Sequence, residues 1–166
     1  MINLHKSVML NEVLSFIPKD KPLNIVDATF GGGGYTKAIL NNCKVSQLLA
    51  IDRDPVSKIF YNEIKSKFVN FHLINDKFSN IENIVKSSKF KDKKYDIIIY
   101  DLGISSNQLD ISKRGFSFKT DGPLDMRMGL SDKKAFEIIN NYDEKNLANI
   151  IFNYGEERYS RQIAKQ

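Results

Sequence analysis

The sequence predicts an α/β fold in which a parallel sheet carries helices on both faces. Apolar segments alternate with segments of helical spacing four times between residues 23 and 103, the pattern of a doubly wound sheet. The runs IVDA, LLAI and DIIIY have consecutive apolar residues and no polar–apolar alternation, as expected for strands buried on both faces. With 166 residues, 42% of them hydrophobic, the chain has the size of one ordinary domain.

The four predicted strands are short, and they are LNIVDA (23–28), SQLLAID (46–52), NFHLIN (70–75) and YDIIIYDLG (95–103). Apolar residues at helical spacing predict helices between them, over residues 5–17, 35–42, 55–67 and 79–88. Pro18 ends the first helix, because proline cannot continue it. Pro55 suits the first turn of the third helix.

From residue 106 the alternation of strands and helices stops. The segment SSNQLDISKRGFSFKTDGPLDMRMGLSD is rich in Gly, Asp and Ser and has no long helical pattern. Helical spacing resumes over residues 133–141 and 143–166. We therefore predict two regions, a sheet region over 1–105 and a mainly helical region over 106–166 that is inserted in the sheet or appended to it.

The composition of the chain limits the partners, the cellular compartment and the metal sites that we expect for this protein. The net charge of +5 permits a nucleic-acid partner without requiring one, and the KFKDKK run at 89–94 is interpreted as solvated surface. One cysteine, Cys43, excludes an intrachain disulfide and fits the cytoplasm; we interpret it as a small helix-end residue. No apolar run is long enough to cross a bilayer, so no membrane partner is expected. His5 and His72 lack metal-ligand spacing, so no metal is expected.

Four consecutive glycines, Gly31 to Gly34, follow the first strand and open a helix. Such a turn presents backbone N–H groups and lets a ligand approach the backbone. Neither GxxxxGK[ST] nor GxGxxG is matched here. Asp52 ends the second strand about 20 positions further on, where a carboxylate can accept both ribose hydroxyls. The turn and the acid together predict an adenosine-type cofactor.

Two cofactors fit this pattern, a nicotinamide dinucleotide and S-adenosylmethionine. The first needs a pyrophosphate turn, which is imperfect here, whereas the second carries no phosphate. Phe78 follows the third strand and suits a wall for adenine, and Asp101 follows the fourth and suits the cofactor tail or the nucleophile. Asp27 is expected to bind N–H groups of the glycine turn or a cofactor amine. These residues favour a methyltransferase, with a nicotinamide-dependent oxidoreductase as the alternative.

The chain also contains five longer sequence motifs that are typical of one protein family. They are DATFGGGGYT, IDRDP, DLGISSNQLD, RGFSFKTDGPLDMRM and NYGEER. In this order and at these spacings the chain, from His5 to its last residue, resembles the bacterial MraW-type family, which methylates the N(4) amine of a cytidine in 16S ribosomal RNA. The resemblance implies a Rossmann-like class I methyltransferase sheet, here its first four parallel strands, followed by a helical insert. It also implies S-adenosylmethionine as cofactor, 16S ribosomal RNA or the small ribosomal subunit as partner, and a cytoplasmic location.

The resemblance further implies cofactor contacts, and these fall at Gly33, Gly34, Tyr35, Asp52, Phe78, Asp101 and Gln108. This chain departs from the family pattern at two positions. The family usually has histidine where Tyr35 stands and proline where Asn107 stands. A tyrosine still packs and hydrogen-bonds at a helix start, and an asparagine loosens the backbone ahead of Gln108.

The resemblance also bears on length. Family members are about twice the size of one domain, and a complete sheet of this type has three more strands. We therefore interpret the chain as the amino-terminal part of a longer protein or a truncated product. An exposed parallel-strand edge invites pairing, which allows a homodimer. A non-catalytic or vestigial RNA-binding fragment is the alternative function.

Methyl transfer to a cytosine amine requires side chains that accept the amine N–H groups and side chains that hold the base outside its stack. Acceptors for the amine N–H groups help to localise its lone pair, and we expect Asp101, with Ser105 and Ser106, in this role; the alternative for Asp101 is a cofactor-binding acid only. The base must leave its stack. Phe116 and Phe118 can stack on it, although anchoring of the insert is the favoured interpretation.

Two arginines and one short motif have two interpretations each. Arg114 and Arg127 either contact phosphate or pair with Asp121 or Asp125 within their loop. The GEER motif is interpreted as a helix start with an ion pair, and binding of RNA is its alternative.

Overall fold

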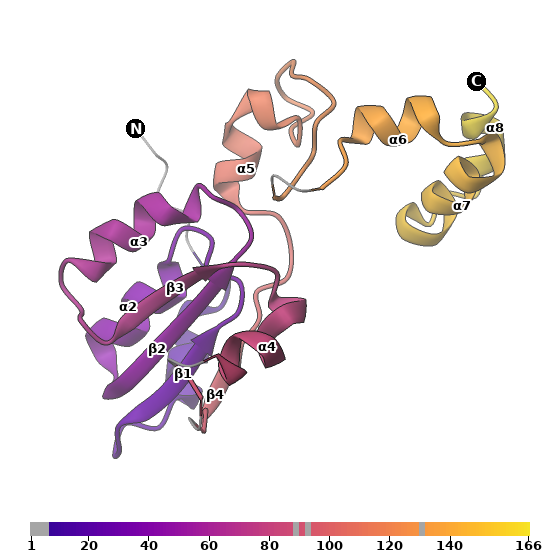
Figure 1. Cartoon of the computed structure of the whole chain (residues 1–166). Helices are drawn as coiled ribbons and strands as arrows, with labels where there is room; N and C mark the ends of the chain where they lie inside the picture. Colours follow the sequence, from indigo (N-terminus) through magenta and orange to yellow (C-terminus); the bar gives the residue numbers. More distant parts are fainter. Residues whose placement is uncertain (1–6, 88–89, 92–93, 130–131) are drawn as a thin grey trace. The chain divides into compact units, whose positions relative to one another are not determined.

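The structure is a computed structural model that describes residues 7–87, 90–91, 94–129 and 132–166, apart from the side chain of Asn107 (Figure 1). His5 and part of the KFKDKK run therefore lie outside the described residues. The chain divides into two compact units. The first unit comprises Met1–Gln108 and Met128–Leu130. The second unit comprises Leu109–Arg127 and Ser131–Gln166. Our proposed boundary between residues 105 and 106 lies close to this division.

The first unit is built on four parallel strands, which are β1 (Leu23–Asp27), β2 (Val45–Asp52), β3 (Phe71–Asn75) and β4 (Ile97–Ile99). Their order across the sheet is β3-β2-β1-β4 (Figure 1). The predicted Rossmann-like α/β arrangement of the first four strands is confirmed. The order places β1 and β2 in the centre, so the residues that follow these two strands lie between those that follow β3 and β4.

β4 is much shorter than the predicted 95–103, and side-chain contacts with the region of β1 lie at both of its ends. Before the strand, the N–H of Asn24 donates to the Asp96 carboxylate at 2.9 Å. After it, the N–H of Asp101 donates to Oγ1 of Thr29 at 2.7 Å. Asp101 therefore stands in a loop, beyond the end of its strand.

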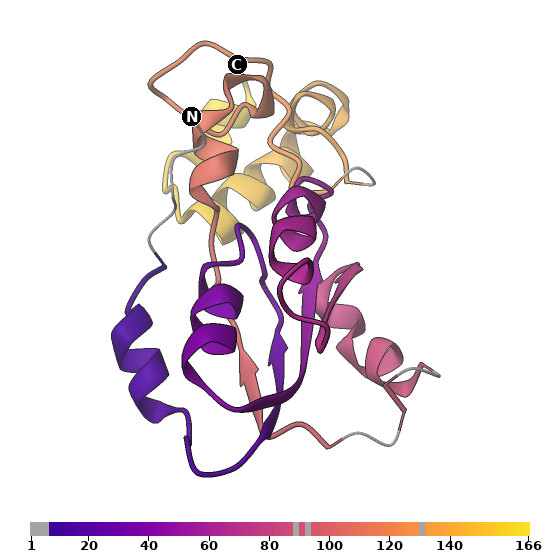
Figure 2. The same cartoon turned by 90° about the vertical axis from the view of Figure 1, so that its left-hand side faces the viewer.

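The helices of this unit are α1 (Leu10–Phe16), α2 (Gly34–Asn42), α3 (Ser57–Lys65) and α4 (Ile81–Lys86), with a single 3₁₀ turn η1 (Phe78–Asn80) before α4. Successive strand residues point to opposite faces. Ile25 and Leu48 pack with α1, α2 and α3, whereas Val26 and Leu49 pack with α4. Figure 2 shows α1 and α2 on one side of the sheet and α4 on the other.

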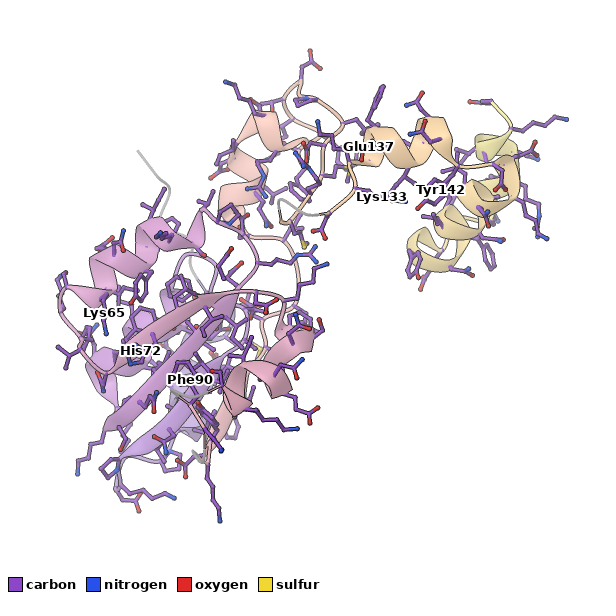
Figure 3. All side chains as sticks on the ribbon, in the orientation of Figure 1. Lys65, His72, Phe90, Lys133, Glu137 and Tyr142 are labelled. Atoms are coloured by element: carbon purple, nitrogen blue, oxygen red, sulfur yellow. The ribbon has the colours of Figure 1, made fainter. Side chains whose placement is uncertain are left out.

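Lys65 and His72, both labelled in Figure 3, make the contacts that hold β3 against the segments beside it. Lys65, the last residue of α3, donates from Nζ to the carbonyl oxygens of Val69 and Phe71, each at 2.7 Å, and so closes the turn into β3. The His72 ring lies edge-on to Phe90 with centroids 5.9 Å apart. His72 is thus part of the packing beside α4.

The second unit is mainly helical. Its elements are α5 (Ser106–Asp110, which spans the division), the 3₁₀ turn η2 (Ser112–Arg114), α6 (Ala135–Asn141), α7 (Glu144–Gly155) and α8 (Ser160–Ala164). Lys133 Nζ lies 5.1 Å from the ring centroid of Tyr142 and 3.2 Å from its hydroxyl oxygen, which ties the two ends of α6 together (Figure 3).

The prediction of one helical stretch over 143–166 is wrong, because the chain breaks between α7 and α8. Glu156 has φ of 53°, in the left-handed region, and stops α7. The GEER motif both ends α7 and leads into α8, where the carbonyl oxygen of Glu157 accepts the N–H of Ser160 at 3.1 Å, so its interpretation as a helix start holds for α8. Gly155 ends α7, and Glu157 accepts the N–H of Tyr159 at 2.8 Å in the link before α8. The Arg158 guanidinium lies 4.8 Å from the centroid of the Tyr159 ring.

Candidate functional site

Three carboxylates lie at the carboxyl ends of the parallel strands. Asp27 ends β1, Asp52 ends β2, and Asp101 follows β4. Because the strands are parallel, these ends meet on one side of the sheet, where ligands of such sheets bind. Burial is the main cause that raises the pKa of Asp27, and the charges of Asp52 and Asp101 add to the rise. The structure therefore brings together the three acids that the strand pattern singled out.

Asp27 is the most deeply buried of the three, with 1% of its surface exposed. Its carboxylate accepts the hydroxyl of Thr36 at 2.7 Å and the N–H of Thr29 at 3.4 Å. These partners flank the glycines, so the expectation that Asp27 binds the glycine N–H groups themselves is wrong. Burial raises the pKa of Asp27 to about 6. Thr36, whose hydroxyl is wholly buried, was not predicted.

A pH dependence of stability follows from Asp27. Its pKa is raised in the folded state, so the unfolded chain ionises first, and the free energy of unfolding falls as pH rises from about 4 to about 6. A shift of about two units corresponds to about 3 kcal/mol. Urea unfolding from pH 4 to pH 7 is expected to show Asp27→Asn gaining about this much relative to the wild type. Curves that stay parallel across this range would contradict the assignment.

Asp52 holds the glycine turn. Its Oδ2 accepts the N–H of Gly31 at 2.5 Å, and its Oδ1 accepts the N–H of Asp54 at 2.8 Å. Gly31 has φ of 54°, which glycine adopts without strain. Burial raises the pKa of Asp52, although the two N–H donors oppose this. One N–H of the turn is therefore committed to a protein carboxylate.

Gly33 and Gly34 begin α2. Gly33 is the residue before the helix, with φ of 77°. A Cβ on Gly33 would lie 2.7 Å from Cδ1 of Ile64 and 2.9 Å from the ring of Phe30, both buried. Glycine is therefore required at this position by both its backbone angle and its packing. The N-terminal N–H groups of α2 begin immediately afterwards.

Tyr35 directs its side chain into the protein. The residue is 7% exposed and packs in the core on the α2 side of the sheet. Its hydroxyl donates to the carbonyl oxygen of Val8, ahead of α1. Burial, and then the charge of Asp101, raise the pKa of Tyr35. A ligand contact at Tyr35 is consequently one to its backbone.

Two aromatic rings form an exposed apolar surface after β3 and β4. Phe78 opens η1, and Tyr100 directly follows β4. The ring centroids are 5.6 Å apart, the planes stand at 80°, and the residues are 43% and 47% exposed. Phe78 thus has the exposure that a wall for adenine needs. Tyr100 was missed because the predicted fourth strand extended through it.

The loop after β4 ends in a reciprocal cap of α5. The N–H of Ser105 donates to Oε1 of Gln108 at 2.9 Å, and the N–H of Gln108 faces Oγ of Ser105 at 3.3 Å. This is a capping box, and the sequence signal for it is the pattern S-x-x-Q at 105–108. Nε2 of Gln108 also donates to Oδ2 of Asp54 at 3.1 Å. Asp54, 8% exposed, was not predicted.

Asp101, Ser105 and Ser106 are all half-buried. The backbone of Asp101 is fixed by Thr29, as described for β4, and Ser105 is fixed by the cap of α5. Ser106 is the first residue of α5. The three candidates for contact with a nucleophile thus belong to one short segment, and its two ends are held by side chains of the protein.

The loop over residues 112–127 folds back on itself, and its backbone segments approach each other closely at two glycines. A Cβ on Gly115 would lie 2.1 Å from the carbonyl oxygen of Pro123, and one on Gly122 would lie 2.1 Å from that of Ser112. Phe118, between them, is fully exposed, and its role as an anchor of the insert stays a prediction. Phe116 is half-buried and lies 5.9 Å from the Arg114 guanidinium.

Arg127 forms an ion pair with a carboxylate of the same loop. It pairs with Asp125 through Nε and Nη2, each at 2.8 Å, and lowers the pKa of Asp125 to about 2. Arg114 donates from Nη2 to the carbonyl oxygen of Arg127 at 2.7 Å. For Arg127, the interpretation as a partner of Asp125 is therefore confirmed.

In the part of the chain that the structure describes, no three His, Cys, Asp or Glu side chains gather in a way that suits a metal ion. Among these residues, too, no helix has both the length and the apolar character to cross a membrane. Cys43 immediately follows α2, as predicted, and burial raises the pKa of its thiol.

Comparison with known proteins gives consistent matches. The model of the MraW methylase family matches residues 3–166. A protein of Ehrlichia canis named ribosomal RNA small subunit methyltransferase H is 46% identical over 166 residues, which are 98% of this chain and 54% of that protein. The protein of the same name from Rickettsia bellii is 46% identical over 164 residues, or 98% of this chain and 52% of that protein.

This chain therefore spans about half the length of the curated relatives it matches. Among solved structures, an rRNA methylase from Streptococcus thermophilus has a TM-score of 0.44 and 24% sequence identity, covering 57% of this chain and 53% of that one.

Proposed function

Because the chain belongs to the MraW methylase family, we propose that it is the cofactor-binding part of an S-adenosylmethionine-dependent RNA methyltransferase. Its substrate is a cytidine of 16S ribosomal RNA, which receives a methyl group on its N(4) amine. The names of the relatives support ribosomal RNA of the small subunit as the substrate. The cytidine and its N(4) amine come from the motif resemblance. Such a substrate places the protein in the cytoplasm.

The observation that carries the proposal is the set of three acids with Asp52 bound to the glycine turn. S-adenosylmethionine has a positive sulfonium and an ammonium group and no phosphate. Asp27, Asp52 and Asp101 are three carboxylates at one end of the sheet, and carboxylates complement these positive groups. A dinucleotide would instead bring two phosphates to a turn whose Gly31 N–H already binds Asp52. The residues present fit the sulfonium compound.

The residues that would hold the cofactor follow from this placement. We propose Asp52 for the ribose hydroxyls, Phe78 for the adenine face, Asp101 for the charged tail, and the backbone of Gly33, Gly34 and Tyr35 for close approach. When bound, the cofactor supplies an activated methyl group. Its leaving group is neutral, so the chain's own contribution is mainly to position the reactants.

Asp101 is also our candidate for orienting the nucleophile. Its carboxylate can accept an N–H of the target amine, and the Ser105 and Ser106 hydroxyls lie in the same segment. The fixed loop ends reduce the reorganisation that such acceptors need. Phe118, fully exposed, is proposed to stack on a nucleobase of the RNA. The alternative is a fragment that binds RNA without catalysis, which methyl transfer by the purified chain would exclude.

Calorimetric titration of the chain tests the cofactor assignment. S-adenosylmethionine and S-adenosylhomocysteine are expected to bind and to raise the melting temperature, because a ligand that binds only the folded state stabilises it. NAD is expected to give neither effect. Binding of NAD, with no response to either S-adenosyl compound, would refute the proposal and support an oxidoreductase.

A further inference from the structure

The short segment over residues 28–31, which follows β1, is bonded to both neighbours of that strand. On one side, the N–H of Ala28 donates to the carbonyl oxygen of Ile99, the last residue of β4, at 2.9 Å. On the other side, the N–H of Phe30 donates to the carbonyl oxygen of Ile51, in β2, at 3.1 Å. The segment therefore bridges the carboxyl ends of β4 and β2, which flank β1 in the sheet.

Thr29, within this segment, is bonded to two of the three acids of the candidate site. Its Oγ1 accepts the N–H of Asp101 at 2.7 Å, and its own N–H donates to Oδ1 of Asp27 at 3.4 Å. Two residues further on, the N–H of Gly31 donates to Oδ2 of Asp52 at 2.5 Å. All three acids are thus attached to residues 29–31, and Asp101 is attached through the hydroxyl of a side chain.

The position of Asp101 depends on this hydroxyl because Asp101 lies beyond the β1–β4 ladder, whose last pair is Asp27 with Ile99. Residues 102–104 are exposed, and a Cβ on Gly103 would have no atom within 4 Å. The loop between Asp101 and the cap of α5 therefore offers little packing that could hold the acid. Thr29 is itself half-buried, so water can replace its hydroxyl only in part.

We propose that Thr29 is a positioning residue whose hydroxyl sets the carboxylate of Asp101 relative to that of Asp52. It acts through the backbone N–H of Asp101, at the start of the loop that also carries Ser105. This inference rests on the proposed function for the ligand that it names. The bond from Asp101 to Thr29 can be tested without any ligand.

Removing only the hydroxyl tests the role of Thr29 in binding. Thr29→Val keeps the shape of the side chain and is expected to bind S-adenosylhomocysteine about 10-fold more weakly, because Asp101 leaves its place. Thr29→Ser keeps the acceptor and should bind within about 3-fold of the wild type. Thr120→Val, the same substitution at an exposed residue of the second unit, is the matched control and should also stay within about 3-fold.

The variant Asp101→Ala separates positioning from direct contact. It removes the carboxylate that Thr29 positions and keeps the N–H of residue 101. In this background Thr29→Val is expected to change the affinity by less than about 2-fold, whereas it lowers the melting temperature by about 3 °C in both backgrounds. A 10-fold loss that persists without the Asp101 carboxylate would show that Thr29 contacts the ligand or supports the whole fold, and would overturn the proposal.

Amide hydrogen exchange, followed by NMR, tests the bond without a ligand. The N–H of Asp101 is expected to exchange at least about 10-fold faster in Thr29→Val than in the wild type, whereas that of Ala28 keeps its rate because its bond to Ile99 remains. Equal exchange rates of the Asp101 amide in the two proteins would overturn the proposal. If the wild type binds no S-adenosyl compound while this amide loses its protection, the proposed function fails and the placement of Asp101 by Thr29 is supported.

Discussion

Replacing Asp52 by alanine is expected to weaken binding of S-adenosylhomocysteine by about 100-fold or more. The side chain is proposed to accept two ribose hydroxyls, and hydrogen bonds to a charged group contribute about 1.5–3 kcal/mol each. It also accepts the N–H groups of Gly31 and Asp54, so alanine would release the glycine turn as well. A loss of about 3 kcal/mol or more corresponds to this change in affinity. Isothermal titration calorimetry at pH 7.5 measures it.

Asp20→Ala is the matched control for this experiment. It removes the same charge from an exposed residue that lies before the amino end of β1, away from the acids. Its affinity should stay within about 3-fold of the wild type. If Asp52→Ala binds as tightly as Asp20→Ala, the ribose contact is made by another group, and the assignment of Asp52 is wrong.

Replacing Gly33 by alanine is expected to lower the free energy of unfolding by about 3 kcal/mol. The left-handed backbone at φ of 77° costs a residue with a Cβ about 1–2 kcal/mol. Overpacking adds about 1–3 kcal/mol, because the new atom would meet Ile64 and Phe30 in a filled core. Urea unfolding followed by circular dichroism gives the difference.

Gly155→Ala provides the comparison. Gly155 closes α7, and a Cβ there has no atom within 4 Å. The substitution is expected to change the free energy of unfolding by no more than about 1 kcal/mol, since alanine favours helices. Equal losses at the two positions would show that the contacts of Gly33 with Ile64 and Phe30 do not govern stability.

Periodicity predicted the architecture well because the strands are buried on both faces. Alternating residues such as Ile25 and Val26 serve different faces, and both faces require apolar side chains. The acids stood out by contrast, since Asp27 and Asp52 end two of these apolar runs. The location of the site at the carboxyl ends of the strands then follows from the parallel arrangement.

What the sequence did not reveal depends on contacts between distant segments. The bounds of β4 could not be predicted from its own residues, since the contacts at its two ends are made with Asn24 and Thr29, from the region of β1. Thr36 looks like any polar residue at a helix start, and only the fold places its hydroxyl on Asp27. The S-x-x-Q pattern at 105–108 can be recognised in the sequence as a helix cap. The bond from Gln108 to Asp54 cannot be predicted from the sequence.

The separation along the chain of the residues that pair in the site has a consequence for folding. Asp52 and Gly31 are 21 positions apart, whereas Asp101 and Thr29 are 72 positions apart. Closing the longer loop costs more chain entropy, and pairings between distant segments slow folding. The ribose acid and the glycine turn can therefore assemble during early collapse, before β4 docks beside β1. We expect Asp101 to reach its place later in refolding than Asp52, because β4 must first pair with β1 across the longer stretch of chain.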